Sequence, residues 1–447
     1  MKDVTESGAY RSYVLFALIV VYTVNFIDRQ ILGILSIPIQ QELGLTDTQL
    51  GLMRGLSFAL FYSTLGVPVA MLADRMNRVR IMTAALALWS AFTVACGMAT
   101  SFVQLFIARM GVGVGEAGGV APAYSIVSDY FPPSERARAL GIYSFGVPLG
   151  SAIGIVFGGV IATLLDWRTA FFLVGAFGLL LAPILLWTVK EPPRGRFDAP
   201  GARREPAKIG EVVATLAKKP SFWLLSIGGA FSSIMAYGLF AWAPAFFVRL
   251  FGDQLPLVFA SFPPFLLPPN PGPLLYAAYF YGAIVAIGGV AGIFLGGVIA
   301  DRFGAKTKAA YALVPAIAFT ATIPFLILGL NTQSLPVAFV TFVIPTALSL
   351  AWLGPALSAF QNMAPPNMRA TAGAVFLLIN NLIGLGLGDV FIGALSDHFR
   401  AQYGAESIRY SMLAGVGFYV VAATLYFIAA PFLRKDWYVE SDQPAGG

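Results

Sequence analysis

Apolar segments recur along nearly the whole chain of 447 residues. A helix of about 20 such residues is long enough to cross the hydrocarbon core of a bilayer. Hydrophobic residues make up 58% of the chain and charged residues only 11%, whereas about 25% of a typical soluble domain is charged. The chain is therefore expected to be an all-α membrane protein. Twelve spans are predicted, near residues 13–36, 50–72, 81–100, 102–127, 138–165, 169–189, 222–249, 276–300, 309–330, 335–359, 371–395 and 409–433.

The positive residues are distributed unevenly between the loops. Most of the 28 lysines and arginines fall in alternate inter-span segments, beginning with the segment before the first span. This bias places both termini in the cytoplasm, because cytoplasmic loops carry the excess of positive charge. A multi-pass protein of the cell (inner or plasma) membrane is expected. The net charge of +6 then reflects topology, and no nucleic-acid partner is predicted.

The longest polar stretch contains several prolines, glycines and basic residues, as linkers do. We expect an N-terminal six-helix bundle at residues 1–190, a cytoplasmic linker at 191–220 and a C-terminal six-helix bundle at 221–447. A second proline-rich stretch, residues 255–273, is predicted to be irregular. It is either a loop packed on the outer surface or a lid that contacts lipid.

Two short motifs occur once in each half. Asp74-Arg75 follows the second span and reappears as Asp301-Arg302 after the eighth. A Pro-Pro pair followed by Arg-Ala likewise precedes the fifth and eleventh spans. The repeats predict two pseudo-symmetric bundles. An acid at a helix end can hold a neighbouring helix while the cytoplasmic face is closed. A gate is therefore predicted at these loops, with topological anchoring as the alternative; its residues are Asp74, Arg75, Arg78, Asp301 and Arg302.

Four charged residues lie inside the first and fourth predicted spans: Asp28, Arg29, Arg109 and Glu116. Each costs about 2.5–3.5 kcal/mol at the membrane centre on insertion scales. Helical rise puts Asp28 about 21 Å from the inner side and Arg109 about 10 Å from the outer side of a core about 30 Å thick. These depths agree, so an Asp28–Arg109 ion pair is predicted. Glu116 lies two turns beyond Arg109 on the same face.

These charges suggest a device for proton coupling. Burial favours the neutral form of a carboxyl group and a nearby arginine favours its charged form, so breaking the pair promotes protonation. We predict that Asp28 and Glu116 carry the proton, and that Arg29 and Arg109 bind an anionic substrate group or alternate as partners. The alternative is a static ion-pair network. With one cysteine and one histidine in the chain, neither a metal site nor a cofactor is predicted beyond protons as the coupling ion.

Further candidates lie in the second half of the chain. Asp389 lies in the eleventh span and is expected to be a hydrogen-bonded structural acid, with a coupling role as the alternative. Several aromatic and amide side chains are candidates for lining the cavity, although aromatic residues also pack or face lipid. They are Tyr237, Phe240, Trp242, Asn380 and Asn381.

Glycines in the fourth and fifth spans are predicted to allow close helix packing. Gly113-Val-Gly115-Glu-Ala-Gly118 matches a dinucleotide-binding pattern, but it lies within an apolar span that a nucleotide cannot reach. Gly111, Gly115 and Gly119 instead share one helix face. The glycines from 146 to 158 are spaced in the same way.

Three motifs together resemble spinster-type transporters of the major facilitator superfamily. They are Asn25-Phe-Ile-Asp28-Arg29, Ala73-Asp74-Arg75-Met-Asn77-Arg78 and Gly113-Val-Gly115-Glu116-Ala117. The resemblance implies the major facilitator fold and proton-coupled alternating access. It also implies an amphiphilic substrate of the lysolipid or sphingoid-phosphate type, and the alternative is a proton-linked carrier of a small organic anion.

Other functional classes are less consistent with the sequence. An enzyme would need a nucleophile with a base or a metal cluster, and neither is evident. Duplicated halves with gate loops also argue against a pore. We expect a monomer whose partners are membrane lipids and the small-molecule substrate.

Overall fold

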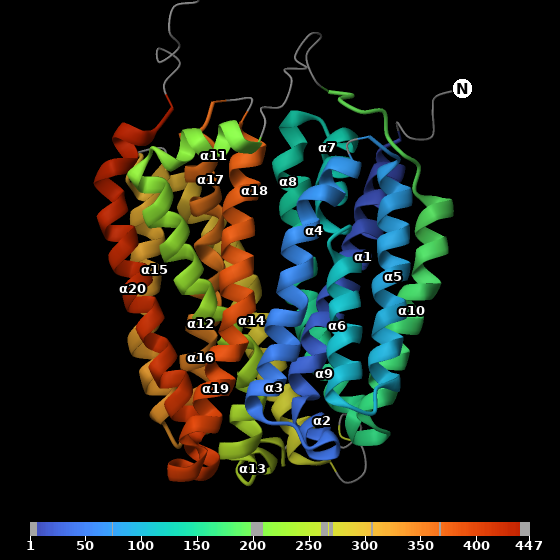
Figure 1. Ribbon diagram of the computed structural model, residues 1–447, viewed down its shortest axis with the longest axis vertical. Coiled ribbons are helices and arrows are strands. Elements are labelled where there is room, and N and C mark those ends of the chain that lie inside the picture. Colours follow the sequence, from blue (N-terminus) through green and yellow to red (C-terminus); the bar gives the residue numbers. More distant parts are fainter. Residues whose placement is uncertain are drawn as a thin grey trace, which may run out of the picture. The chain divides into compact units, whose positions relative to one another are not determined.

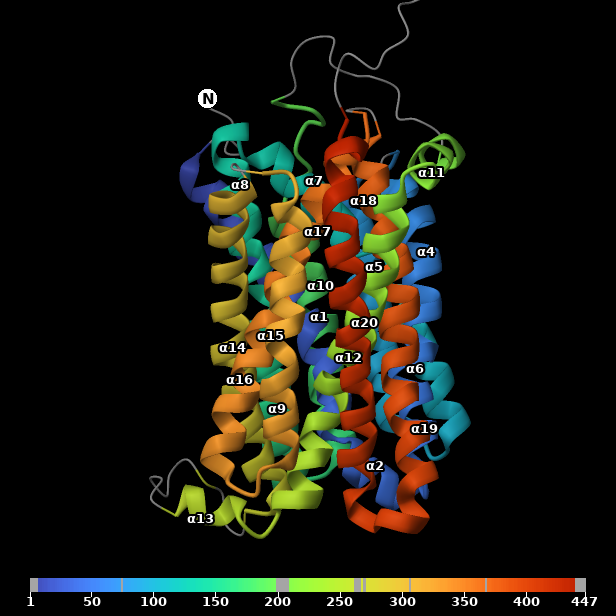
Figure 2. The same ribbon diagram turned by 90° about the vertical axis from the view of Figure 1, so that its left-hand side faces the viewer.

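The computed structural model describes residues 7–73, 75–197, 209–260, 267, 271–304, 307–365 and 368–438. All regular secondary structure in these ranges is helical, and no strand occurs in them. Figures 1 and 2 show long helices that run alongside one another within each part of the chain. The all-α fold class is therefore confirmed.

The first half of the chain begins with a long helix and continues through short and long helices. They are α1 (Gly8–Ile34), α2 (Ser36–Leu43), α3 (Asp47–Gly51), the π-helical turn η2 (Leu52–Leu56), α4 (Ser57–Ala73), α5 (Arg78–Met98), α6 (Phe102–Glu116), α7 (Val120–Tyr130), α8 (Pro133–Ser144), α9 (Gly146–Leu164) and α10 (Trp167–Thr188).

The second half has the same helical character. Its elements are α11 (Ile209–Ala217), α12 (Pro220–Phe251), α13 (Leu255–Phe259), α14 (Pro273–Gly304), α15 (Ala310–Asn331), α16 (Leu335–Ala351), α17 (Leu353–Met363), α18 (Arg369–Asn380), the π-helical turn η4 (Asn381–Leu385), α19 (Gly386–Tyr403), the 3-10 turn η5 (Gly404–Glu406) and α20 (Ser407–Asp436).

Ten segments of the described chain are long and apolar enough to cross a membrane. One of them, Thr371–Asp436, contains two of the predicted spans. The predicted span 102–127 is absent from the ten because the helix is interrupted between Glu116 and Val120. Each of the twelve predicted spans is thus occupied by helix, as the predicted fold requires.

The interruption of the fourth span was not predicted. Residues 117–119 form a turn between α6 and α7, in which Gly118 N–H bonds the Gly115 carbonyl. Glycine is a poor helix former. Pro122 has no N–H to donate to the carbonyl of residue 118. The sequence therefore ends α6 at Glu116 and fixes this acid at a helix terminus.

The chain forms two compact units. Unit 1 comprises residues 1–199, 238–286 and 389–411, and unit 2 comprises residues 200–237, 287–388 and 412–447. This division follows packing and does not test the predicted boundaries at 190 and 220. The helices of unit 1 have two ends. We call them the Asp47 end, where α3 begins at Asp47, and the Arg78 end, where α4 ends and α5 begins at Arg78.

Part of the proline-rich stretch is regular. Leu255–Phe259 forms the single-turn helix α13, with Pro256 in its first turn, where the missing proline N–H is tolerated. The expectation of an irregular segment is therefore wrong for these five residues. The rest of the prediction for 255–273 falls largely on residues 261–266 and 268–270, which lie outside the described residues.

Glycines bring the helices of unit 1 into close contact, as predicted. A Cβ atom on Gly115 would lie 2.6 Å from the Trp89 backbone nitrogen of α5. One on Gly154 would lie 2.8 Å from the Ile27 carbonyl oxygen of α1. These distances are shorter than van der Waals contact, so α5–α6 and α1–α9 pack closely only because both positions lack side chains.

We predict that Gly154→Ala destabilises the protein by about 1–3 kcal/mol, because the added methyl group would overlap the α1 backbone. Thermal unfolding in detergent would show this as a lower midpoint. Gly141→Ala is the matched control, since a Cβ atom at Gly141 meets nothing within 4 Å. Equal midpoints for the two variants would contradict the packing argument.

Candidate functional site

Two ion pairs join α1 to α6 in the interior of unit 1. Arg109 Nη1 lies 3.4 Å from Asp28 Oδ1, and the Thr93 hydroxyl of α5 donates to Asp28 Oδ2 at 2.7 Å. Arg29 Nε donates to Glu116 Oε2 at 2.6 Å. Each of the two helices thus contributes one acid and one base, and each acid pairs with the base of the other helix.

The Arg29 guanidinium is surrounded by aromatic rings. Its Cζ atom lies 4.5 Å from the ring centroid of Tyr62, 4.7 Å from that of Phe58 and 5.1 Å from that of Phe26. Cation–π attraction holds an arginine in an apolar surrounding without a further anion. The rings also exclude water, which strengthens the ion pair with Glu116.

The cluster is deeply buried but incompletely hydrogen-bonded. The side chains of Asp28, Arg109 and Glu116 are at most 2% exposed and that of Arg29 is 15% exposed. Within the described chain, Arg29 Nη2, Arg109 Nε and Glu116 Oε1 have no hydrogen-bond partner. Buried groups with spare donors and acceptors can change partners or bind a ligand. The arrangement can therefore exchange protons and hold an anion.

The predicted Asp28–Arg109 pair is present in the structure. The Arg29–Glu116 pair was not specified, because helical rise gives the depth of a residue but not which side chain it faces. The contributions of Thr93 and Tyr62 were also missed. An uncharged residue in an apolar span carries no comparable signal in one sequence.

We predict that Thr93→Val lowers the rate of transport about tenfold or more, because Asp28 loses a charge-assisted hydrogen bond worth about 1.5–3 kcal/mol. Initial rates in reconstituted vesicles measure this effect. Thr93→Ser keeps the hydroxyl and should retain most of the rate. A normal rate in the valine variant would show that the hydrogen bond is dispensable.

The Arg78 end holds Arg75 and Arg78, two of the predicted gate residues of the first repeat. Arg78 is buried and binds Asp129 at 2.5 Å and Glu191 at 2.6 Å, so it connects α5 to the end of α7 and to the segment that follows α10. Asn77 caps α5 by accepting the Arg80 N–H.

The other gate residues are less fully described. Arg75 and Arg302 are exposed. Asp74 lies outside the described residues, as does the side chain of Asp301. The gate assignment therefore stays a prediction.

A second network occupies the Asp47 end and was not predicted. The Asp47 carboxylate is fully buried and accepts hydrogen bonds from Gln40, Arg249 and Ser396 at 2.7–2.8 Å. Arg249 belongs to α12 and Ser396 to α19. One carboxylate therefore connects segments that are about 150–350 residues apart in sequence, as follows from their numbering.

The same end carries a contact between α19 and the start of α3. Asp397 accepts the backbone N–H groups of Asp47 at 3.0 Å and Thr48 at 2.7 Å. A carboxylate is favourable there, because the first N–H groups of a helix are unpaired and partly positive. Gly51 allows this approach, since a Cβ atom on it would lie 2.5 Å from the Asp389 carbonyl oxygen.

Asp389 lies in a further buried ion pair within unit 1. Arg54 Nε is 3.6 Å from Asp389 Oδ2, and the Arg54 guanidinium lies 4.1 Å from the Trp242 ring centroid. Trp242 Nε1 donates to the Asp389 carbonyl at 3.0 Å. Arg54 lies in the π-helical turn η2, a feature that often occurs at functional positions.

The proposed cavity-lining residues differ in exposure. Trp242 is fully buried beneath Arg54. Asn380 accepts from Ser233 at 2.8 Å, and the Tyr237 hydroxyl lies 3.4 Å from Asn381 Oδ1. Phe240 is partly exposed, and its carbonyl lies 3.5 Å from the Tyr281 hydroxyl. Their assignment as a cavity lining stays a prediction.

Comparison with known proteins assigns the chain to a family. The sequence profile of the Major Facilitator Superfamily matches residues 18–388. The chain belongs to the Major Facilitator Superfamily. A relative described as an MFS-type efflux pump, from Mycolicibacterium smegmatis, is 30% identical over 94% of this chain and 92% of its own length.

Within the Major Facilitator Superfamily, the chain is a transporter of the spinster type, a class that works by alternating access. Human protein spinster homolog 1 is 28% identical over 99% of this chain and 84% of that protein. A crystal structure of a bacterial homolog of the human lysosomal transporter Spinster, inward-facing and unoccupied, has a TM-score of 0.84 and 35% identity. The alignment covers 97% of this chain and all of that one. Such relatives are transporters, so the expectation that the chain is not an enzyme is confirmed.

The buried charged side chains that the structure describes in this transporter lie in unit 1. Among the residues whose burial the structure describes, the buried charged side chains are Asp28, Asp47, Arg54, Arg78, Arg109, Glu116, Asp129 and Asp389. Buried polar side chains described in unit 2 are hydroxyls and one amide. Charge-dependent chemistry in the described part therefore concentrates in one unit.

Proposed function

We propose that the protein is a proton-coupled secondary transporter of an amphiphile with an anionic head group, of the lysolipid or sphingoid-phosphate type. The observation that carries this proposal is the pair of crossed ion pairs between α1 and α6, Asp28–Arg109 and Glu116–Arg29. Ionisable side chains inside a membrane are costly and commonly mark proton relays or substrate sites.

The crossed pairs link proton binding to anion binding. A proton on Glu116 neutralises its charge and frees Arg29, and a proton on Asp28 frees Arg109. A freed guanidinium can bind a phosphate or carboxylate group through two parallel hydrogen bonds. The anion then holds the arginine away from its former partner, so the proton and the substrate favour each other's binding.

Two features favour an amphiphile over a small anion. Aromatic rings surround Arg29, so an apolar group beside the anionic head would not be left in water. The spinster-type relationship supports the same class of substrate.

We also propose the membrane arrangement. Both termini lie in the cytoplasm of the cell (inner or plasma) membrane, because the basic residues gather in the loops on that side. The transporter acts as a monomer surrounded by membrane lipids, with protons as the coupling ion and without a metal or other cofactor. The Arg78 end then faces the cytoplasm.

Vesicle transport with an imposed pH gradient tests the proposal. Purified protein in liposomes should accumulate a labelled lysophospholipid when the gradient is present, and collapse of the gradient by a protonophore should stop this accumulation. Competition should strengthen with acyl-chain length. Competition by a hexuronate or a short carboxylate, with no dependence on chain length, would instead support a small-anion carrier. Accumulation of the lysophospholipid to the same level with and without the pH gradient would refute proton coupling.

A further inference from the structure

The Arg54–Asp389 ion pair lies on elements that hold neither of the crossed ion pairs. Arg54 belongs to η2 and Asp389 to α19, and both side chains are 5% exposed. Arg54 Nε lies 3.6 Å from Asp389 Oδ2. Charges buried within membrane spans are costly and commonly have a function, and the proposed transport cycle gives this pair none.

The pair lies within a close contact between α3–η2 and the first half of α19, which we call the α3–α19 contact. At the Asp47 end of this contact, Asp397 accepts the Asp47 N–H at 3.0 Å. Deeper inside, a Cβ atom on Gly51 would lie 2.5 Å from the Asp389 carbonyl oxygen. Asp47 precedes Arg54 by seven residues and Asp397 follows Asp389 by eight, so the ion pair lies about 10–12 Å from the Asp397 contact along the helices.

The ion pair lacks the hydrogen bonds that usually stabilise a buried carboxylate. Arg54 Nη1 donates to the Ala241 carbonyl of α12 at 3.1 Å. Arg54 Nε and Nη2 and Asp389 Oδ1 have no hydrogen-bond partner within the described chain. Nε and Nη2 form an edge with which an arginine can bind a carboxylate through two parallel hydrogen bonds. Because this edge is unused, the charged form of Asp389 is held by attraction at 3.6 Å without a hydrogen bond.

Asp47 shows the opposite arrangement. Its carboxylate accepts four hydrogen bonds, two of them from Arg249, and such bonds favour the charged form. Burial favours the neutral form of Asp389, and its carboxylate accepts no hydrogen bond that the structure describes. Of these two acids, Asp389 is therefore the one suited to exchange a proton.

Arg54 is the charged group that acts on Asp389 within the described chain. The surrounding charged or titratable side chains come from the three elements packed around the pair. They are Asp47 of α3, Arg249 of α12, and Asp397, His398 and Arg400 of α19. Since Asp47 is paired with Arg249, a neutral Asp389 leaves Arg54 without an anion in contact.

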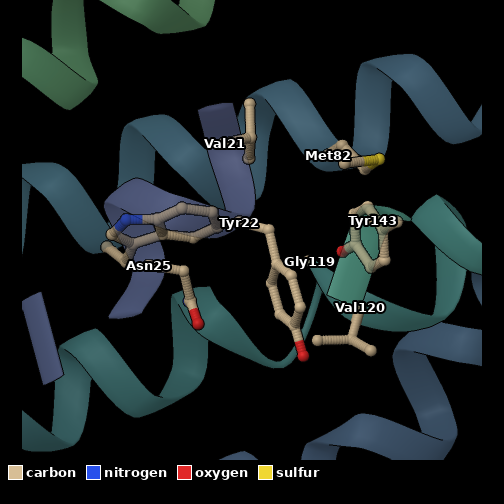
Figure 3. Close-up of a pocket in the computed structure, with 8 residues that line it drawn as sticks. Val21, Tyr22, Asn25, Met82, Gly119, Val120 and Tyr143 are labelled. Atoms are coloured by element: carbon tan, nitrogen blue, oxygen red, sulfur yellow. The ribbon is translucent and has the colours of Figure 1, made fainter. Parts of the chain in front are cut away.

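A proton is the ligand that fits this packed pair. The cavity in Figure 3 has a volume of about 10 Å³ and is lined by α1, α5, α7, α8 and Gly119, so it includes neither Arg54 nor Asp389. Arg54 instead lies 4.1 Å from the Trp242 ring centroid, and Trp242 Nε1 donates to the Asp389 carbonyl. A larger ligand would have to displace these groups, whereas a proton needs only a carboxylate oxygen.

We propose that Asp389 is a second proton-binding site of the transporter, reached from the Asp47 end, and that its protonation releases Arg54 from α19. This inference rests on the proposed use of protons as the coupling ion. When the α3–α19 contact opens at Asp397, a proton from water adds to the Asp389 carboxylate. The same proton later returns to water, so no other atom is exchanged. The released Arg54 stays against the Trp242 ring.

Helix α4 connects this site to the crossed ion pairs. Element η2 continues directly into α4, and Phe58 follows Arg54 by about one turn. The Phe58 ring centroid lies 4.7 Å from the Arg29 guanidinium and 5.6 Å from that of Arg109. Movement of η2 after the release of Arg54 therefore changes a ring that contacts both arginines, which lets the two proton sites influence each other.

Infrared difference spectra between acidic and alkaline pH test the site, because a protonated carboxyl group has its own C=O band. Asp389→Asn should remove one such band from the spectrum of the full-length protein, and Asp389→Glu should restore a band at a shifted frequency. Asp253→Asn is the control, since Asp253 is exposed, and it should leave the bands of buried carboxyl groups unchanged. A complete set of wild-type bands in folded Asp389→Asn would overturn the proposal.

Arg54→Gln gives an independent test if Asp389→Asn does not fold. This variant keeps the Asp389 carboxyl group but removes its cation, so the neutral form is favoured. Its band should persist at an alkaline pH at which the wild-type band is lost. Loss of the band at the same pH as in the wild type would overturn the proposal.

Spin labels test the release of Arg54. Labels on new cysteines at Gln41 and Gln402, both exposed, report on the Asp47 end. Asp389→Asn resembles the protonated form, so at neutral pH it should give the distance distribution that the wild type reaches only at acidic pH. Identical pH dependence in the two proteins would overturn the release step.

The proposed function is tested separately in the same infrared experiment. Glu116→Gln should remove a band other than that of Asp389. If it removes none, the coupling role of Glu116 is refuted and the result for Asp389 stands. If Asp389→Asn alone leaves every band in place, the second site is refuted and the role of Glu116 stands.

Discussion

Glu116→Gln is expected to abolish proton-driven accumulation of substrate while leaving some substrate exchange. Glutamine has nearly the same shape as glutamate but cannot take up or release a proton at this position. The change also leaves Arg29 in an apolar site without its anion. Breaking a buried ion pair from one side costs about 3–5 kcal/mol, so the state that contains the closed pair becomes strongly disfavoured.

The measurement compares two transport modes of each variant in vesicles: accumulation of substrate under a pH gradient, and substrate counterflow without a gradient. Accumulation under a pH gradient should fall at least about a hundredfold, as the cost of about 3 kcal/mol implies. Counterflow without a gradient should fall much less. Glu211→Gln is the matched control, because Glu211 lies exposed in α11. Undiminished proton-driven transport in both Glu116→Gln and Asp28→Asn would exclude the proposed coupling.

Asp47→Ala should open the Asp47 end of the transporter. The substitution removes four hydrogen bonds from Gln40, Arg249 and Ser396. It also leaves Arg249, whose side chain is 12% exposed, without its anion. A cost of about 3–5 kcal/mol would shift the ratio of closed to open states by a factor of about 10²–10⁴.

Spin labels can report this opening. Cys96 is the single cysteine of the chain and is buried, so labels can be placed on new cysteines at Gln41 and Gln402, which are exposed. Asp47→Ala should add a population with longer label–label distances and lower the transport rate. Asp253→Ala, an exposed acid near the same end, should do neither. An unchanged distance distribution would show that Asp47 does not hold this end closed.

The fold was predictable from the sequence because its causes are local. Apolar length fixes each span, and the repeat of Asp74-Arg75 as Asp301-Arg302 marks the two halves. The depth of Asp28 and Arg109 follows from helical rise alone, which is why their pairing could be anticipated. Close packing at Gly115 and Gly154 follows from residue size.

The remaining parts of the site depend on contacts that periodicity does not specify. The interruption after Glu116 arises where several glycines combine with Pro122, so no single residue signals it. Arg54 lies near the start of the predicted span 50–72, and nothing in the sequence indicates that it pairs with Asp389, 335 positions away by their numbering. Asp47 and Asp397 lie just outside the predicted spans 50–72 and 371–395, where charged residues are common. The rotation of each helix about its axis and the contacts between distant helices determine these pairs. A single sequence gives neither of the two.

The confinement of the described buried charges to unit 1 has a consequence for how such a transporter can change over evolutionary time. Under the proposed coupling, substitutions among the described apolar and hydroxyl side chains of unit 2 leave the residues that draw on the proton gradient unchanged. A lineage can therefore vary unit 2 while it retains one source of energy.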